Sequence, residues 1–206
     1  MKPAIIGIAG LSGSGKTALA RELASRLPAA SEVIALDSYY HPQSHLSLAD
    51  REHLNYDHPD ALDWNLLVEH LTALSRGDAI EEPQYVFDQY TRGAATRRIH
   101  PQPFLILEGI LTLHHPEIRA LLAMKVFVTT DPEECLRRRL QRDVLERGRT
   151  PKSVTEQYNR TVWPMAMEYV IPSRVHADVV VSGEEPFDRS VMAILESLQR
   201  ADAVAR

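Results

Sequence analysis

The stretch from Gly10 to Thr17 reads GLSGSGKT and fits the pattern G-x-x-x-x-G-K-[ST], which is typical of a phosphate-binding loop. The apolar run AIIGIA (4–9) precedes it, and leucines at helical spacing follow it within 17–27. This order predicts a strand, a loop and a helix, with backbone N–H groups facing phosphate oxygens at the helix N-terminus. A glycine-rich turn with an incidental lysine would not need these flanking patterns. We therefore predict that the chain binds a nucleoside triphosphate.

Two side chains at the end of the loop suit triphosphate chemistry. The Lys16 ammonium supplies a positive charge near the outer phosphates, and the Thr17 hydroxyl is placed to bind Mg²⁺. Mg²⁺ is therefore the expected cofactor. The residues expected to hold the phosphates are Gly10, Ser12, Gly13, Ser14, Gly15, Lys16 and Thr17.

The composition is that of an ordinary globular protein. The chain has 206 residues and a net charge near −5, which argues against broad nucleic-acid binding. Cys135 is the only cysteine, so no intramolecular disulfide can form. No apolar stretch has the length of a membrane span, and Met1-Lys2-Pro3 leads straight into the first expected strand, which leaves no room for a signal peptide. We expect a cytoplasmic protein without a nucleic-acid or membrane partner.

Short apolar runs alternate with amphipathic stretches along the chain. Continuous apolar runs are typical of strands covered on both faces, and they occur at 4–9, 33–36, 104–107, 126–129 and 179–181. Helical patterns occur at 17–27, 63–75, 116–123, 132–147, 153–169 and 187–200. The alternation predicts an α/β fold in which a parallel sheet carries helices on both faces. Ligands bind at the carboxyl ends of such strands, where the phosphate loop, Asp37 and Glu108 lie.

Two segments interrupt this alternation. Residues 38–62 are polar and rich in histidine, and residues 83–101 have the pattern of a β-hairpin that turns near Gly93. Long excursions from a compact sheet are usually functional. No repeat, low-complexity tract or linker divides the sequence, so we expect one domain over 1–206.

Several short motifs occur in a fixed order between about residues 4 and 181. They are 37–40 (DSYY), 55–59 (NYDHP), 107–111 (LEGIL), 138–143 (RRLQRD), 146–149 (ERGR), 157–158 (QY) and 177–178 (AD). Together with the phosphate loop they resemble the uridine/cytidine kinases. The resemblance implies a P-loop kinase that transfers the γ-phosphate of ATP or GTP to the 5′-hydroxyl of a pyrimidine ribonucleoside. It also implies a homo-oligomer, commonly a tetramer.

Two carboxylates follow expected strands beside the phosphate site. Asp37 could accept the proton of an attacking hydroxyl or hold that hydroxyl in line, and a turn cap is the alternative. Glu108 could reach Mg²⁺ together with Thr17, and Gly109 after it would let the backbone pass close to a ligand. A surface acid at a strand end is the alternative for Glu108. The family resemblance assigns Asp37 the catalytic role and agrees with a metal role for Glu108.

The nucleoside would need a partner for its ribose and a surface for its base. A carboxylate such as Asp57 suits a ribose diol, although an aspartate before His-Pro is more often a turn residue. Tyr85 and Phe87, two residues apart on one face of an expected strand, could cover a flat base or pack onto the sheet. The resemblance implies that Asp57 contacts the ribose and that Tyr85, Phe87 and Tyr90 contact the base.

Arginines are concentrated in 137–149. The residues alone leave three interpretations open: a solvated helix face, a nucleic-acid surface and a lid over phosphates. Gly148 is typical of a helix end. The resemblance favours a lid over about 137–157 that brings two catalytic arginines near the ATP phosphates, namely Arg142 and Arg147. The resemblance also implies that three residues contact the nucleoside, namely Arg139, Arg149 and Gln157. We interpret the other two arginines of this stretch, Arg137 and Arg138, as structural or solvated.

Two positions depart from the family pattern. Tyr90 stands where many members carry a histidine whose tautomers can read either pyrimidine edge, whereas a tyrosine is longer and its phenol is held differently. We therefore predict a preference for cytidine. The acidic turn 182–186 (SGEEP) replaces a basic, glycine-rich turn, which leaves the choice between ATP and GTP open.

Other functions explain the sequence less well. Another P-loop kinase of small metabolites, such as a phosphoribulokinase or a pantothenate kinase, would share the loop and the strands but not the motif 55–59. A GTPase-type switch normally carries an N-K-x-D motif, which this sequence lacks. His41 and His45 have no third ligand at metal-site spacing, so no structural zinc site is expected.

Overall fold

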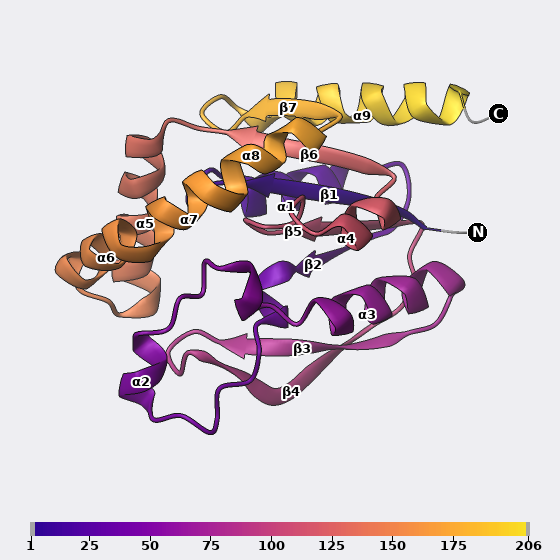
Figure 1. Cartoon of the computed structure of the whole chain (residues 1–206). Coiled ribbons are helices and arrows are strands. Elements are labelled where there is room, and N and C mark those ends of the chain that lie inside the picture. The colour runs from indigo at the N-terminus through magenta and orange to yellow at the C-terminus, as the bar shows by residue number, and fades with distance from the viewer. Residues whose placement is uncertain (1–2, 205–206) are drawn as a thin grey trace.

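Five parallel strands form the centre of the computed structural model, which describes residues 3–204 (Figure 1). Their order is β2-β5-β1-β6-β7, and each neighbouring pair runs parallel. Their bounds are Ala4–Gly10 (β1), Ser31–Ala35 (β2), Phe104–Glu108 (β5), Met124–Thr129 (β6) and Val179–Ser182 (β7). The parallel α/β fold expected from the alternating runs is confirmed.

The strands are apolar throughout because helices cover both faces of the sheet. Successive residues of a strand point to opposite faces, so Ile5 packs in one hydrophobic core and Ile6 in the other. The helices beside Ile6 are α1 (Lys16–Arg26) and α9 (Phe187–Val204), and those beside Ile5 are α3 (Trp64–Arg76) and α4 (Pro116–Leu121). None of the helices within residues 3–204 combines the length and the apolar character needed to cross a lipid bilayer.

The segment after β2 is mostly irregular, as its polar composition predicts. It holds two 3₁₀ turns, Leu36–Tyr39 and Pro59–Ala61, and one short helix, α2 (Leu48–Glu52), which the sequence pattern did not predict. Leu36, expected in the strand, instead begins the 3₁₀ turn that carries Asp37. Asp37 therefore sits on a turn that leaves the sheet at its carboxyl edge.

The expected hairpin is present, but its turn lies elsewhere. Strands β3 (Ile80–Val86) and β4 (Thr91–Ile99) are antiparallel, and residues 87–90 connect them. The prediction of a turn near Gly93 is wrong, because Tyr90 takes the left-handed backbone conformation (φ 50°) and ends the turn. Gly93 lies within β4, where a Cβ atom would come within 3.0 Å of a side chain on β3.

Helix α5 (Pro132–Arg147) follows β6 and ends at Gly148, whose left-handed conformation (φ 63°) caps it. A second helical stretch follows over 151–173 and packs against α5. The sequence predicted one uninterrupted helix over 153–169, but π-helical turns break this stretch twice. Such turns often occur at functional sites. The segments are α6 (Pro151–Gln157), the π-turn Tyr158–Val162, α7 (Trp163–Met165), the π-turn Ala166–Val170 and α8 (Ile171–Ser173).

Candidate active site

A cavity of about 580 Å³ opens at the carboxyl ends of β2 and β5, where the phosphate loop, the hairpin and α5 meet. The residues predicted to bind phosphate, metal or nucleoside or to act in catalysis line this cavity, with the exception of Gly10 and Ser14. They come from segments far apart in the chain. The parallel topology therefore gathers in one place the side chains that the motifs predict.

Two glycines give the phosphate loop its path. Gly13 has φ 88°, and a Cβ atom there would lie 2.3 Å from the backbone carbonyl oxygen of Cys135 on α5. Gly15, with φ 93°, turns the chain into α1. Both conformations are readily adopted by glycine alone. Gly10 ends β1 and Ser14 is fully buried, so these two shape the loop without lining the cavity.

Lys16, Thr17 and Glu108 form one polar end of the cavity. The Thr17 hydroxyl donates a hydrogen bond to the Glu108 carboxylate, with 3.0 Å between the oxygens. The buried Lys16 ammonium donates to the carbonyl of Leu11 at 3.4 Å. Burial lowers the pKa of Lys16, and the negative charges of Glu108 and Asp37 oppose this shift. Burial raises the pKa of Glu108, and the positive charge of Lys16 opposes this increase.

The donor atoms at this end fit a magnesium ion. A threonine hydroxyl and a carboxylate are oxygen ligands of the kind that Mg²⁺ prefers, and Thr17 and Glu108 already touch. Within residues 3–204, no group of three or more His, Cys, Asp or Glu side chains is arranged to hold a metal ion. An ion held here would therefore take most of its ligands from phosphate oxygens and water, as Mg²⁺ commonly does.

Close packing against Leu36 explains why a glycine, Gly109, follows Glu108. A Cβ atom on Gly109 would lie 2.3 Å from the Cβ atom of Leu36. Gly109 does not line the cavity. The close approach that requires a glycine at this position is therefore to the Leu36 side chain.

A second polar group surrounds Asp57, which is 6% exposed. Its carboxylate accepts a hydrogen bond from the Thr161 hydroxyl at 3.3 Å, and burial raises its pKa against the opposing effects of Arg139 and Thr161. Gln157 accepts hydrogen bonds from Arg139, at 2.9 Å, and from Arg149. No sequence motif indicated Thr161, which lies four residues after Gln157 on the first π-helical turn.

Five aromatic rings line the cavity: Tyr40, Tyr56, Tyr85, Phe87 and Tyr90. The ring centroid of Tyr85 lies 5.1 Å from that of Tyr40 and 5.0 Å from that of Phe87. The Tyr56 hydroxyl donates to the backbone carbonyl of Tyr90 at 2.8 Å. Phe87 is 39% exposed, so its ring does not pack into the core. Tyr40 and Tyr56 lie in irregular segments without a periodic pattern, so the sequence predicted no role for either side chain.

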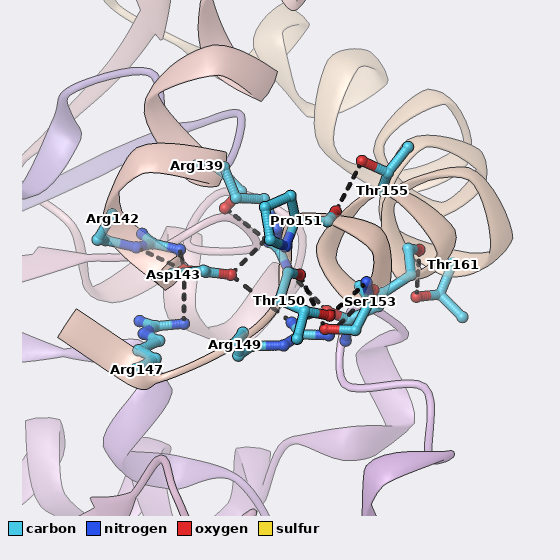
Figure 2. A network of polar contacts seen from close by, with 12 residues as sticks. Arg139, Arg142, Asp143, Arg147, Arg149, Thr150, Pro151, Ser153, Thr155 and Thr161 are labelled. Atoms are coloured by element: carbon cyan, nitrogen blue, oxygen red, sulfur yellow. Dashed lines mark hydrogen bonds and ion pairs between the residues drawn. The ribbon is translucent and has the colours of Figure 1, made fainter. Parts of the chain in front are cut away.

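Four arginines gather around Asp143, which ends the motif 138–143 and for which helical spacing predicts no more than an ion pair with Arg147 (Figure 2). Their closest nitrogens lie 2.7 Å (Arg142), 3.5 Å (Arg147) and 3.6 Å (Arg139 and Arg149) from its carboxylate oxygens. Asp143 is fully buried, whereas all four arginines line the cavity. The arginine-rich helix is therefore not a uniformly solvated face.

Arg139, which was expected to contact only the nucleoside, also contacts the phosphate loop. One guanidinium nitrogen donates to the hydroxyl of Ser12 in the phosphate loop at 2.8 Å. Another donates to Gln157 at 2.9 Å. Arg139 thus connects the phosphate loop to the helical stretch that carries Gln157.

Arg138 makes structural contacts, as expected for it, and it also lies at the cavity wall. Besides pairing with Glu134 at 2.6 Å, it lines the cavity and donates to the carbonyl of Gly183 at 2.8 Å. Gly183 belongs to the turn after β7, so nothing in the local sequence of α5 indicates this contact. Arg137 is exposed and pairs with Glu134 at 2.6 Å, in line with a solvated role.

Comparison with known proteins points to one kinase family. The family model described as "Phosphoribulokinase / Uridine kinase family" matches residues 5–185. The uridine kinase of Vibrio parahaemolyticus is 47% identical over 182 residues, which cover 86% of this chain and 85% of that one. The uridine kinase of Shewanella amazonensis is 46% identical, and the match covers 86% of each chain.

Solved structures share the fold at low sequence identity. A putative fructose transport system kinase from Silicibacter sp. TM1040 has a TM-score of 0.71 at 20% identity, covering 87% of this chain and 89% of that one. A possible uridine kinase from Bacillus stearothermophilus has a TM-score of 0.61 at 17% identity, covering 88% and 89%. These likenesses support the P-loop kinase fold.

Proposed function

Since this chain belongs to the phosphoribulokinase/uridine kinase family, we propose that it transfers the γ-phosphate of ATP or GTP to the 5′-hydroxyl of a pyrimidine ribonucleoside. The product is the nucleoside 5′-monophosphate, as in pyrimidine salvage. The uridine kinases it resembles are matched over most of their length, so the proposal concerns the whole reaction.

One observation carries this proposal: a single cavity combines a site for a metal-bound triphosphate with an aromatic site for a base. Lys16 marks the first site, and Asp57 lies beside the second. Asp37 lines the same cavity as Lys16 and Asp57, and its negative charge acts on both groups. In phosphoryl transfer, the attacking hydroxyl has to meet the terminal phosphate at such a point.

Each polar group at the triphosphate end has a separate task in this reaction. Lys16 and the loop N–H groups hold the phosphates, while Thr17 and Glu108 would hold Mg²⁺, which neutralises charge on the phosphate oxygens. Asp37 orients the 5′-hydroxyl and accepts its proton at a carboxylate oxygen. The guanidinium groups nearest the transferred phosphoryl group are those of Arg142 and Arg147.

The nucleoside is held by groups of a different kind. The Asp57 carboxylate accepts hydrogen bonds from the two ribose hydroxyls, for which an ionised carboxylate is suited. Tyr85 and Phe87, whose side chains line the cavity, contact the base. The remaining polar contacts are proposed for Arg139, Arg149 and Gln157.

We further propose that cytidine is the preferred acceptor. Tyr90 is anchored at the hairpin turn by its left-handed backbone and by the hydrogen bond from Tyr56 to its carbonyl. The backbone of Tyr90 is therefore fixed, and its phenol hydroxyl lies farther from that backbone than the ring nitrogens of a histidine would. This limits its ability to serve both pyrimidine edges equally.

Analogy with the family suggests a homotetramer that acts in the cytoplasm. Light scattering coupled to size-exclusion chromatography tests the tetramer, and fractionation of the source cells tests the location. Neither property enters the argument for the reaction.

An acceptor screen tests the proposed reaction directly. Purified protein, Mg²⁺ and either ATP or GTP are incubated with each ribonucleoside and deoxyribonucleoside, and monophosphates are identified by mass spectrometry. We expect cytidine and uridine 5′-monophosphate, with cytidine the better substrate. A sugar phosphate or pantothenate as the only accepted substrate would favour the related metabolite kinases instead. Slow hydrolysis that no acceptor stimulates would favour a switch-type NTPase.

A further inference from the structure

Asp143 combines features that an ordinary helical ion pair does not have. Its side chain is fully buried, and four guanidinium groups lie within 3.6 Å of its two carboxylate oxygens (Figure 2). Arg142 donates twice to Oδ1, from Nε at 2.9 Å and from Nη2 at 2.7 Å. Oδ2 lies 3.6 Å from both Arg139 and Arg149 and makes no hydrogen bond of its own within the described residues.

The backbone of Asp143 also fixes the chain beyond the helix. Its carbonyl accepts the N–H of Gly148 at the helix cap and the N–H of Arg149 at 3.1 Å. Arg149 thus lies beyond the end of α5 and is still tied to the same residue as the arginines within α5. One residue therefore organises guanidinium groups from both sides of the helix end.

The charges in this cluster do not balance. Four guanidinium groups and one carboxylate leave an excess of three positive charges. The arginines line the cavity, whereas Asp143 lies behind them and does not. Four like charges would separate without a shared counter-charge, because their mutual repulsion is strong in a poorly solvated site. The arrangement keeps the arginines together while leaving most of their charge for an anionic ligand in the cavity.

We propose that Asp143 is a positioning residue for phosphoryl transfer: its carboxylate holds Arg139, Arg142, Arg147 and Arg149 in the arrangement that they present to the substrates. The proposal rests on the function proposed above. Asp143 acts through the arginines, since it does not line the cavity. The alternative is a purely structural role, in which Asp143 only stabilises the end of α5.

Replacing Asp143 by asparagine should affect MgATP binding and turnover in opposite ways. Asp143→Asn removes one negative charge, so attraction between the cluster and a triphosphate becomes stronger at long range. The same change releases the arginines from their shared partner, and misplacement by about 1 Å costs about 100-fold in rate. We therefore expect MgATP to bind within about twofold of the wild-type affinity, or more tightly, while kcat falls about tenfold or more. A structural role alone would instead reduce the amount of folded protein and leave kcat per binding site unchanged.

The experiment measures MgATP binding by calorimetry, kcat with cytidine, and the unfolding temperature for wild type, Asp143→Asn and Asp143→Glu. The glutamate variant keeps the charge but moves it by one methylene, so kcat should lie between those of the other two proteins. Should the asparagine variant not fold, Asp143→Glu decides on its own: at least a threefold fall in kcat with MgATP binding retained supports positioning. Glu133→Gln, an exposed acid on α5, is the matched control and should behave as wild type.

Two results would overturn the proposal. The first is a kcat per binding site that is unchanged in the folded variants. The second is a loss of rate that follows the loss of MgATP binding in proportion. Failure of the proposed function is a separate outcome, because it appears in the wild-type protein as absence of any nucleoside monophosphate. In that case the ratio of variant to wild-type rate is taken from ATP hydrolysis and still decides the role of Asp143.

Discussion

The guanidinium of Arg147 lies over the ring of Phe87, with 3.9 Å between its Cζ atom and the ring centroid. Arg147 is the last residue of α5, and Phe87 is the first residue after β3, so this contact joins the arginine-rich helix to the hairpin. A cation is attracted to the face of an aromatic ring. The two elements that border the cavity are therefore linked directly to one another.

Removing the Phe87 ring should weaken nucleoside binding. In Phe87→Ala we expect the nucleoside KM to rise about tenfold, because base–aromatic stacking contributes about 1–3 kcal/mol per base. The unfolding temperature should change little, since the ring is 39% exposed. Steady-state kinetics and thermal denaturation measure the two effects. Phe87→Tyr keeps the ring and should retain the wild-type KM, and equal KM values in all three proteins would show that Phe87 does not contact the base.

The positions of Asp37 and Glu108 could be expected from the sequence for a simple physical reason. Continuous apolar runs locate parallel strands, and polar residues that follow such runs converge at one edge of the sheet. No comparable rule locates Asp143. Its spacing to Arg139 and Arg147 is that of ordinary surface ion pairs on a helix. The structure adds Arg149 from beyond Gly148 to these partners and buries the carboxylate completely, and helical spacing predicts neither feature.

The hairpin shows a second limit of sequence reasoning. Glycine is the usual marker of a turn, which favoured Gly93. The structure places the left-handed residue at Tyr90 instead, where the tyrosine carbonyl is held by the Tyr56 hydroxyl. A hydrogen bond from a distant segment thus stabilises a backbone conformation that the local sequence does not favour.

Exchanging Tyr90 for histidine should widen base selection. We expect Tyr90→His to raise kcat/KM for uridine relative to cytidine by about tenfold, because imidazole can present either a donor or an acceptor to the base. Competition between the two nucleosides, with both monophosphates quantified in one reaction, gives the ratio. Tyr90→Phe removes the hydroxyl without adding a tautomer and should not favour uridine. Comparable use of both nucleosides by the wild-type protein would contradict the proposed preference.

Asp37 should matter for turnover far more than for binding. In Asp37→Asn we expect kcat to fall by about 10²–10⁴-fold, the usual contribution of a positioned general base. MgATP affinity should remain within a few-fold of wild type, because the phosphate loop and Lys16 are untouched. Asp78→Asn, at an exposed position after α3, is the matched control. A variant that keeps most of its kcat with an unchanged unfolding temperature would show that Asp37 caps its 3₁₀ turn and is not the base.

Because Glu108 is buried, we expect its ionisation to lower the free energy of unfolding as pH rises. Burial raises the pKa of Glu108, so the folded protein binds this proton more tightly than the unfolded chain does. The stabilising effect of that proton is present at low pH and is lost as pH rises from the unfolded pKa, 4.5, through the raised folded value. Above the raised folded pKa, the ionised, buried carboxylate therefore lowers the free energy of unfolding. The charges that act on it are those of Lys16, Asp37 and Arg21.

Glu108→Gln tests this sign, because glutamine keeps the shape and does not ionise. The unfolding temperature of the variant, compared with wild type, should rise as pH increases from about 4 to about 7, by about 2–4 °C for each 1 kcal/mol of burial cost removed. Added MgATP should stabilise the wild type more, since the carboxylate is proposed to hold the metal. Glu117→Gln, an exposed acid on α4, controls for the loss of one carboxylate. A difference that shrinks with rising pH would mean that Lys16 outweighs burial and that the Glu108 pKa lies below its usual value.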